Sequence, residues 1–121
     1  MSFPSINFKI TNTEIDDTLK DIAENKLSVL DKFIGNHSSI CEVEFEKITN
    51  HHQQGDIHRV EVNLQIDGKL FRAESTAESF EKSLDEVKED LWNKLQSIKG
   101  KKDTLLKKGA RKIKEMMIWN K

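Results

Sequence analysis

The sequence predicts an α+β fold in the order β-α-β-β-β-α, with two helices packed on one face of a four-stranded, mainly antiparallel sheet. Three observations support it. Apolar and polar residues alternate in three short stretches, two longer stretches repeat apolar residues every three or four positions, and an Asp-Gly pair follows the last alternating stretch. Because 121 residues suffice for one core and not for two, we expect one domain, residues 1–102, and a basic C-terminal extension, residues 103–121.

The first strand and first helix are predicted by a change of period. Ile6, Phe8 and Ile10 alternate with polar residues, as in a strand with one buried face. Asp16 suits the N-cap of a helix of roughly five turns, which Gly35 would end. The apolar stripe of this helix comprises Leu19, Ala23, Leu27, Leu30 and Ile34.

The middle of the chain is predicted to be an antiparallel meander. Alternation in 41–45 and again in 60–66 predicts two strands, separated by a polar loop over 49–56. Asp67 and Gly68 both tolerate positive φ and suit a tight hairpin turn. We therefore expect a fourth strand near 70–75.

The second helix has the longest apolar stripe of the chain. Ser75 and Glu78 have the spacing of a capping box, and Gly100 or the residues just after it are expected to end the helix. Its stripe comprises Phe80, Leu84, Val87, Leu91, Leu95 and Ile98.

Several functional classes find no support. The single Cys41 cannot form an internal disulfide, and the N-terminal region has no apolar run long enough for a signal peptide or membrane span, so we expect a cytoplasmic protein. The four histidines lack metal-ligand spacing, and there is no phosphate-binding glycine loop or nucleophile motif. We expect no enzyme activity, metal, cofactor or small-molecule substrate.

Charge divides the chain sharply between residues 93 and 94. Residues 1–93 carry 10 Lys or Arg against 19 Asp or Glu, a net charge of −9, whereas 94–121 carry 10 against 2, a net charge of +8. Such density is costly in self-repulsion unless a polyanion relieves it, so nucleic acid is the leading partner. A solvating tail and a membrane-surface helix are the alternatives. The apolar Met116, Met117 and Trp119 could dock on the domain, on a partner protein or on RNA bases.

With this order of elements, the chain resembles the ribosome hibernation-promoting and ribosome-associated inhibitor family, once called sigma-54 modulation proteins. The resemblance covers residues 6 to about 102. The first feature that carries it is the stretch Lys-Leu-Ser-Val-Leu-Asp-Lys-Phe at 26–33, which is similar to the family's K-L-x-K-L-E-K-aromatic run. The other features are Val-Glu-Val at 60–62, the Asp67-Gly68 turn, and the 79–102 helix with its lysine-rich end.

The resemblance implies a fold similar to double-stranded-RNA-binding domains and a site on the small ribosomal subunit where transfer RNA and messenger RNA would otherwise lie. Such a short-form member would inhibit translation by occupancy under stress or in stationary phase, and a monomer is expected. The family's basic positions would correspond to Lys20, Lys26, Lys32, Lys94, Lys99, Lys101 and Lys102.

The family's second helix usually carries further basic residues where this chain has Asp90, Asn93 and Ser97. We therefore expect the extension to supply RNA contacts as well, through Lys107, Lys108, Arg111, Lys112 and Lys114. The alternative is a protein-interaction module that uses the acidic domain and the apolar C-terminal end without binding RNA.

Overall fold

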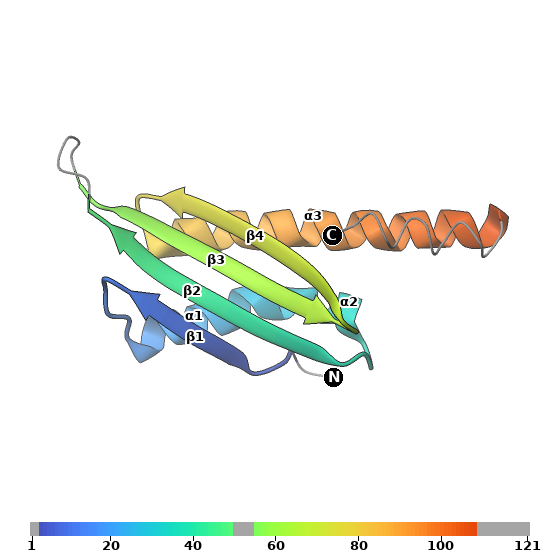
Figure 1. Ribbon diagram of the computed structural model, residues 1–121, viewed down its shortest axis with the longest axis horizontal. Helices are drawn as coiled ribbons and strands as arrows, with labels where there is room; N and C mark the ends of the chain where they lie inside the picture. The colour runs from blue at the N-terminus through green and yellow to red at the C-terminus, as the bar shows by residue number, and fades with distance from the viewer. Residues whose placement is uncertain (1–2, 50–54, 109–121) are drawn as a thin grey trace.

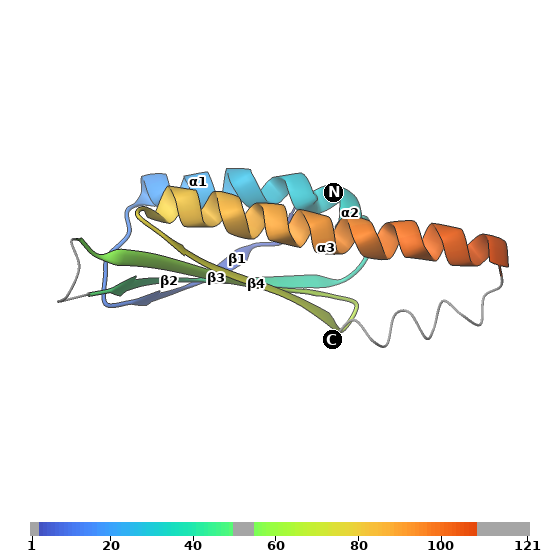
Figure 2. The same ribbon diagram turned by 90° about the horizontal axis from the view of Figure 1, so that it is seen from above.

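The computed structural model describes residues 3–49 and 55–108, with side chains described as far as residue 98. A four-stranded sheet carries all its helices on one face, as Figures 1 and 2 show from two directions. The elements in chain order are β1 (Ile6–Thr11), α1 (Asp17–Leu27), a 3-10 turn η1 (Ser28–Leu30), α2 (Asp31–Ile34), β2 (Ser39–Ile48), β3 (Ile57–Ile66), β4 (Lys69–Ala77) and α3 (Phe80–Lys108). The predicted α+β fold is confirmed.

The strands lie in the order β1-β2-β3-β4, so every neighbour in space is also the next strand in sequence. β1 and β2 pair in parallel, because the helical crossover of α1 to α2 returns the chain to the same end of the sheet. β2, β3 and β4 pair antiparallel, as the meander predicted. Asp67 and Gly68 form the tight turn between β3 and β4, with φ of 51° and 82°.

The core lies between the sheet and the helices. Val43, Val62 and Ala73 are neighbours across three strands and are all buried. Above them pack the predicted stripes of both helices, whose fully buried members include Leu27 of α1 and Leu91 of α3. Burying a leucine side chain contributes about 2 kcal/mol, so these two stripes anchor the helix layer to the sheet.

The first helix departs from the predicted single rod. Asp16 is its N-cap, accepting a hydrogen bond of 2.9 Å from the backbone N–H of Leu19. The helix then tightens into η1, where the Ser28 hydroxyl donates to the carbonyl of Asn25 at 2.8 Å. Bonding of this kind competes with the helical ladder and bends helices, which accounts for the interruption. The apolar stripe continues through it to Ile34.

The predicted capping box and the predicted C-terminal end of the second helix were both wrong. Ser75 lies within β4, and Ser79 caps α3 by accepting a hydrogen bond of 3.2 Å from the N–H of Lys82. The capping box fails because Ser75 is paired with Val60 in the sheet. α3 also continues through Gly100 to Lys108. A glycine inside a helix costs about 1 kcal/mol relative to alanine, and the good helix formers after it can offset this.

We predict that the Cys41 thiol is chemically inert in the folded chain. It is fully buried on β2, and burial, with a smaller contribution from the charge of Glu42, raises its pKa to about 12. The reactive thiolate is therefore scarce at neutral pH. A thiol reagent at pH 8 should label Cys41 only after urea unfolds the protein, and labelling as fast as that of a free thiol would contradict the burial.

The raised pKa of Cys41 also implies that the protein becomes less stable at alkaline pH. A thiol whose pKa is raised in the folded state favours folding while it is neutral. That contribution falls as the pH rises from about 9, where the unfolded thiol ionises, toward about 12. The Cys41→Ala variant has no thiol to ionise, so its stability should fall less between about pH 9 and about pH 12.

Candidate nucleic-acid interface

Two of the four predicted RNA-binding lysines with described side chains are neutralised within the protein. Lys26 of α1 forms an ion pair with Asp85 of α3, with 2.6 Å between Nζ and Oδ1. Lys94 of α3 pairs with Asp90 at 3.0 Å and also donates to the backbone carbonyl of Arg72 on β4 at 2.6 Å. These contacts tie α3 to α1 and to the edge of the sheet, so both lysines hold the domain together.

The other two lysines lie over aromatic rings. The Lys20 ammonium is 5.9 Å from the ring centre of Phe8 on β1. The Lys32 ammonium is 4.8 Å from the ring centre of Trp92 and 5.4 Å from that of Phe33. Neither lysine has a carboxylate partner among the residues the structure describes. Their charge is therefore available to an external anion.

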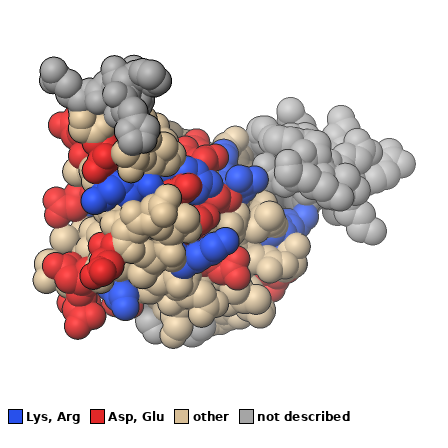
Figure 3. All heavy atoms as spheres, turned by 60° about the vertical axis from the view of Figure 1, so that its left-hand side comes forward, with Lys and Arg blue, Asp and Glu red and all other residues tan. Residues whose placement is uncertain are grey.

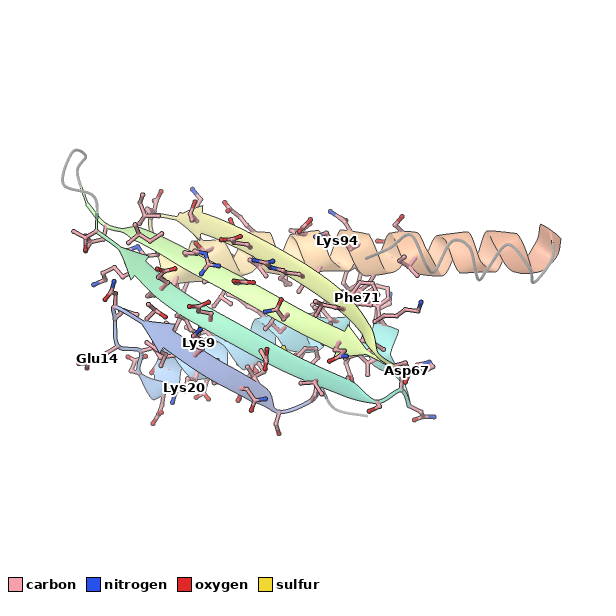
Figure 4. The ribbon with its side chains drawn as sticks, viewed as in Figure 1. Lys9, Glu14, Lys20, Asp67, Phe71 and Lys94 are labelled. Atoms are coloured by element: carbon pink, nitrogen blue, oxygen red, sulfur yellow. The ribbon has the colours of Figure 1, made fainter. Side chains whose placement is uncertain are left out.

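The helix-layer lysines do not gather at one place. Figure 4 shows Lys20 beside β1, at one edge of the sheet, and Lys94 beside β4, at the other. On the side of the molecule drawn in Figure 3, basic and acidic side chains are interspersed. The lysines that the resemblance selects lie on the helices, but the fold distributes them over two edges of the sheet and pairs half of those described.

The largest run of positive charge follows α3 toward its C-terminal end. The backbone of Lys99, Lys101, Lys102, Lys107 and Lys108 lies in the last turns of this helix, which project beyond the end of the sheet (Figure 2). Arg111, Lys112, Lys114 and the apolar residues Met116, Met117 and Trp119 lie outside the described residues. α3 continues through residues 102 and 103, between which the boundary of the C-terminal extension was expected.

The open face of the sheet holds an ion network that could not be predicted from the sequence. Arg59 of β3 contacts four glutamates: Glu44 at 3.4 Å, Glu46 at 3.0 Å, Glu61 and Glu74. These residues come from β2, β3 and β4 and become neighbours through the strand register. The alternation of Glu42, Glu44 and Glu46 was a visible signal, but their shared cation could not be identified without the register.

This network changes the titration of its members. Hydrogen bonds to Glu74 and Glu61 raise the pKa of Arg59. Burial raises the pKa of Glu44, but hydrogen bonds from Thr11 and Arg59 outweigh that effect and leave it below its usual range. Both groups are therefore held in their charged forms at neutral pH.

The open face is a poor surface for a polyanion. Five glutamates, at 42, 44, 46, 61 and 74, stand on it with three cations, Lys9, Arg59 and Arg72. A hollow of about 480 Å³ between β1, β2 and β3 is lined partly by three of these glutamates, Glu42, Glu44 and Glu61. A carboxylate surplus repels phosphate, so this face is unsuited to a polyanionic partner.

Two other kinds of site are absent from the described part of the chain. Residues 3–49 and 55–108 contain no group of three His, Cys, Asp or Glu that could hold a metal ion. Within the same ranges, no helix combines the length and apolarity required of a membrane span.

The comparisons with known proteins agree with this architecture. The family model described as "Sigma 54 modulation protein / S30EA ribosomal protein" matches residues 6–103. The Protein Y N-terminal domain of Thermus thermophilus has a similar structure, with a TM-score of 0.65, 22% sequence identity, and coverage of 78% of this chain and 98% of that one. A ribosomal subunit interface protein from Coxiella burnetii has a TM-score of 0.61, 19% identity, and coverage of 78% and 97%. No curated protein sequence matches the chain.

Proposed function

Because this chain belongs to the sigma 54 modulation protein / S30EA ribosomal protein family, we propose that it is a ribosome-associated hibernation factor of the cytoplasm. It binds small-subunit ribosomal RNA at the channel for transfer RNA and messenger RNA, and silences the ribosome by occupancy under stress or in stationary phase. Members of the family are non-enzymatic factors, so the proposed activity is binding. The family match over residues 6–103 is the observation that carries the proposal.

The distribution of charge supports RNA as the ligand. Lys99, Lys101 and Lys102 follow one another without an intervening carboxylate, and on the helix side Lys20 and Lys32 have no described carboxylate partner. Binding of phosphate by such cations releases counterions and becomes weaker as salt rises. The open face of the sheet carries more carboxylates than cations, so it faces away from the RNA in the proposed complex.

We predict that the full-length chain co-sediments with purified small ribosomal subunits at low salt and is released as the salt concentration rises. The logarithm of the binding constant should fall with the logarithm of salt concentration by about 0.7 to 0.9 per phosphate contact. Subunits preloaded with transfer RNA and messenger RNA should bind less of the chain. Failure to co-sediment even at low salt would refute the proposed function.

A further inference from the structure

Three side chains form a compact group where α2 meets α3, which we call the Trp92 cluster: Lys32, Phe33 and Trp92. The rings of Phe33 and Trp92 meet edge to face, with centroids 5.1 Å apart. The Lys32 ammonium lies over both rings. Val29, four positions before Phe33 in the sequence, leaves 46% of its surface exposed.

Phe33 and Trp92 pack against the core but are only partly buried, so part of this group is accessible to a ligand. The buried stripe of α3 passes through Leu91 and Leu95, and Trp92 lies one residue beyond it, at the border between core and solvent. The indole is only partly buried, and Lys32 is exposed. An indole with accessible surface and a cation beside it is a suitable surface for a ligand that has both a flat π-system and negative charge.

We propose that the Trp92 cluster stacks an unpaired nucleobase of RNA, with Lys32 pairing with a neighbouring phosphate. This inference rests on the proposed function and adds a particular contact to it. In the free protein the Lys32 ammonium covers the indole. On binding, the ammonium moves to the phosphate, and the base takes its place against the ring. Nucleobase stacking on aromatic side chains is tolerant of sequence because every base has a π-face.

The surrounding charge favours RNA over a protein as the occupant. α3 becomes basic after Trp92, because Lys99, Lys101 and Lys102 follow Lys94, itself paired with Asp90, without an intervening carboxylate. A strand that lies along this end of the helix therefore brings its phosphates to the lysines and a base to the cluster. Because Phe33 contacts the indole from α2, two packed elements hold the ring in place before binding.

The test uses the full-length Trp119→Phe chain, in which Trp92 is the only tryptophan. A single-stranded RNA oligonucleotide of mixed sequence is titrated into it at low salt. We expect saturable quenching of the Trp92 fluorescence, with a midpoint that moves to higher RNA concentration as salt is added. Inorganic polyphosphate, which is anionic but has no bases, should bind without comparable quenching. Equal quenching by polyphosphate would overturn the inference.

A second variant separates stacking from folding. Trp92→Leu in the same chain keeps an apolar side chain against Phe33 but cannot stack, and it should bind RNA and small subunits about ten-fold more weakly, which is about 1.4 kcal/mol. Thermal unfolding of this variant verifies that it is folded. Lys32→Gln should lower the salt dependence by about one phosphate contact and leave the quenching in place.

The outcomes distinguish this inference from the proposed function. Unchanged affinity of folded Trp92→Leu for RNA and subunits overturns the stacking site, while the hibernation factor stands. Loss of affinity for subunits alone, with free RNA bound as before, also overturns it, because the ring would then contact a ribosomal protein. If the unsubstituted chain binds no small subunits at low salt, it is the proposed function that fails.

Discussion

Replacing the six lysines and arginines between residues 103 and 121 by glutamine will weaken binding to small ribosomal subunits by about 100-fold at low salt. Each charge-assisted interaction with a phosphate contributes on the order of 1 kcal/mol or more, so the removal of about three such interactions accounts for this factor. The slope of binding against salt should become shallower by about one unit for each phosphate that is no longer neutralised. Co-sedimentation over a series of salt concentrations measures both quantities.

The glutamine variant tests the charge more specifically than a deletion of residues 103–121 would. It keeps the length of the chain and its apolar residues Met116, Met117 and Trp119. Deletion should weaken binding at least as much. If the glutamine variant binds subunits as well as the unsubstituted chain and only deletion weakens binding, the apolar end is the active part. That result would favour the protein-interaction module over RNA binding by the extension.

Substituting Arg59 by Met will lower the free energy of unfolding by roughly 3 kcal/mol. Arg59 is 15% exposed and is shared by four glutamates, so its removal leaves partly buried carboxylates without their common cation. The value is at the lower end for breaking a buried ion pair because the network still has access to water. Urea denaturation at pH 7 measures the change.

The loss of stability in acid should be weaker in this variant. In the unsubstituted chain the Glu44 pKa lies below its usual value of 4.5, so its contribution to stability is present above that pH and is lost as the pH falls through the folded-state pKa. Arg59 is one of the groups that lower the Glu44 pKa, so without it less stability should be lost as the pH falls below about 4.5.

Arg72→Met provides the matched control, because this arginine is 57% exposed and contacts only Glu61 and Glu74 of the same network. It should cost under about 1 kcal/mol and leave the loss of stability in acid unchanged. Equal losses of stability for the two variants would show that Arg59 is not the centre of the network.

The elements that could be predicted from sequence are those specified by nearby residues. Asp16 caps α1 because its partner, the N–H of Leu19, is three positions away. The Asp67-Gly68 turn depends on backbone freedom at two adjacent residues, and the helix stripes depend on a period of 3.6. The misplaced cap at Ser75 shows the limit, because strand pairing with Val60 overrode a local motif.

The arrangement of the candidate interface was predictable only in part. The charge division at residue 94 and the family resemblance both identify lysines on the helices and on the extension. Neither identifies which lysines the fold neutralises, because Lys26 and Asp85 are 59 positions apart and meet only when α1 packs against α3. The Trp92 cluster likewise joins α2 to a residue that the stripe of α3 does not include.

Composition and short-range spacing specify the order of the elements, the two apolar stripes, the hairpin turn and the charge difference between the domain and its basic end. These features depend on composition and on spacings of a few residues, so they do not require contacts between residues that are far apart in the sequence. The tertiary structure alone decided that Arg59 gathers four glutamates, that Lys26 and Lys94 are paired, and that Lys32 lies over Trp92. The energy of such interactions falls as the distance between the groups increases. Only folding brings residues so far apart in the chain within a few ångströms of each other.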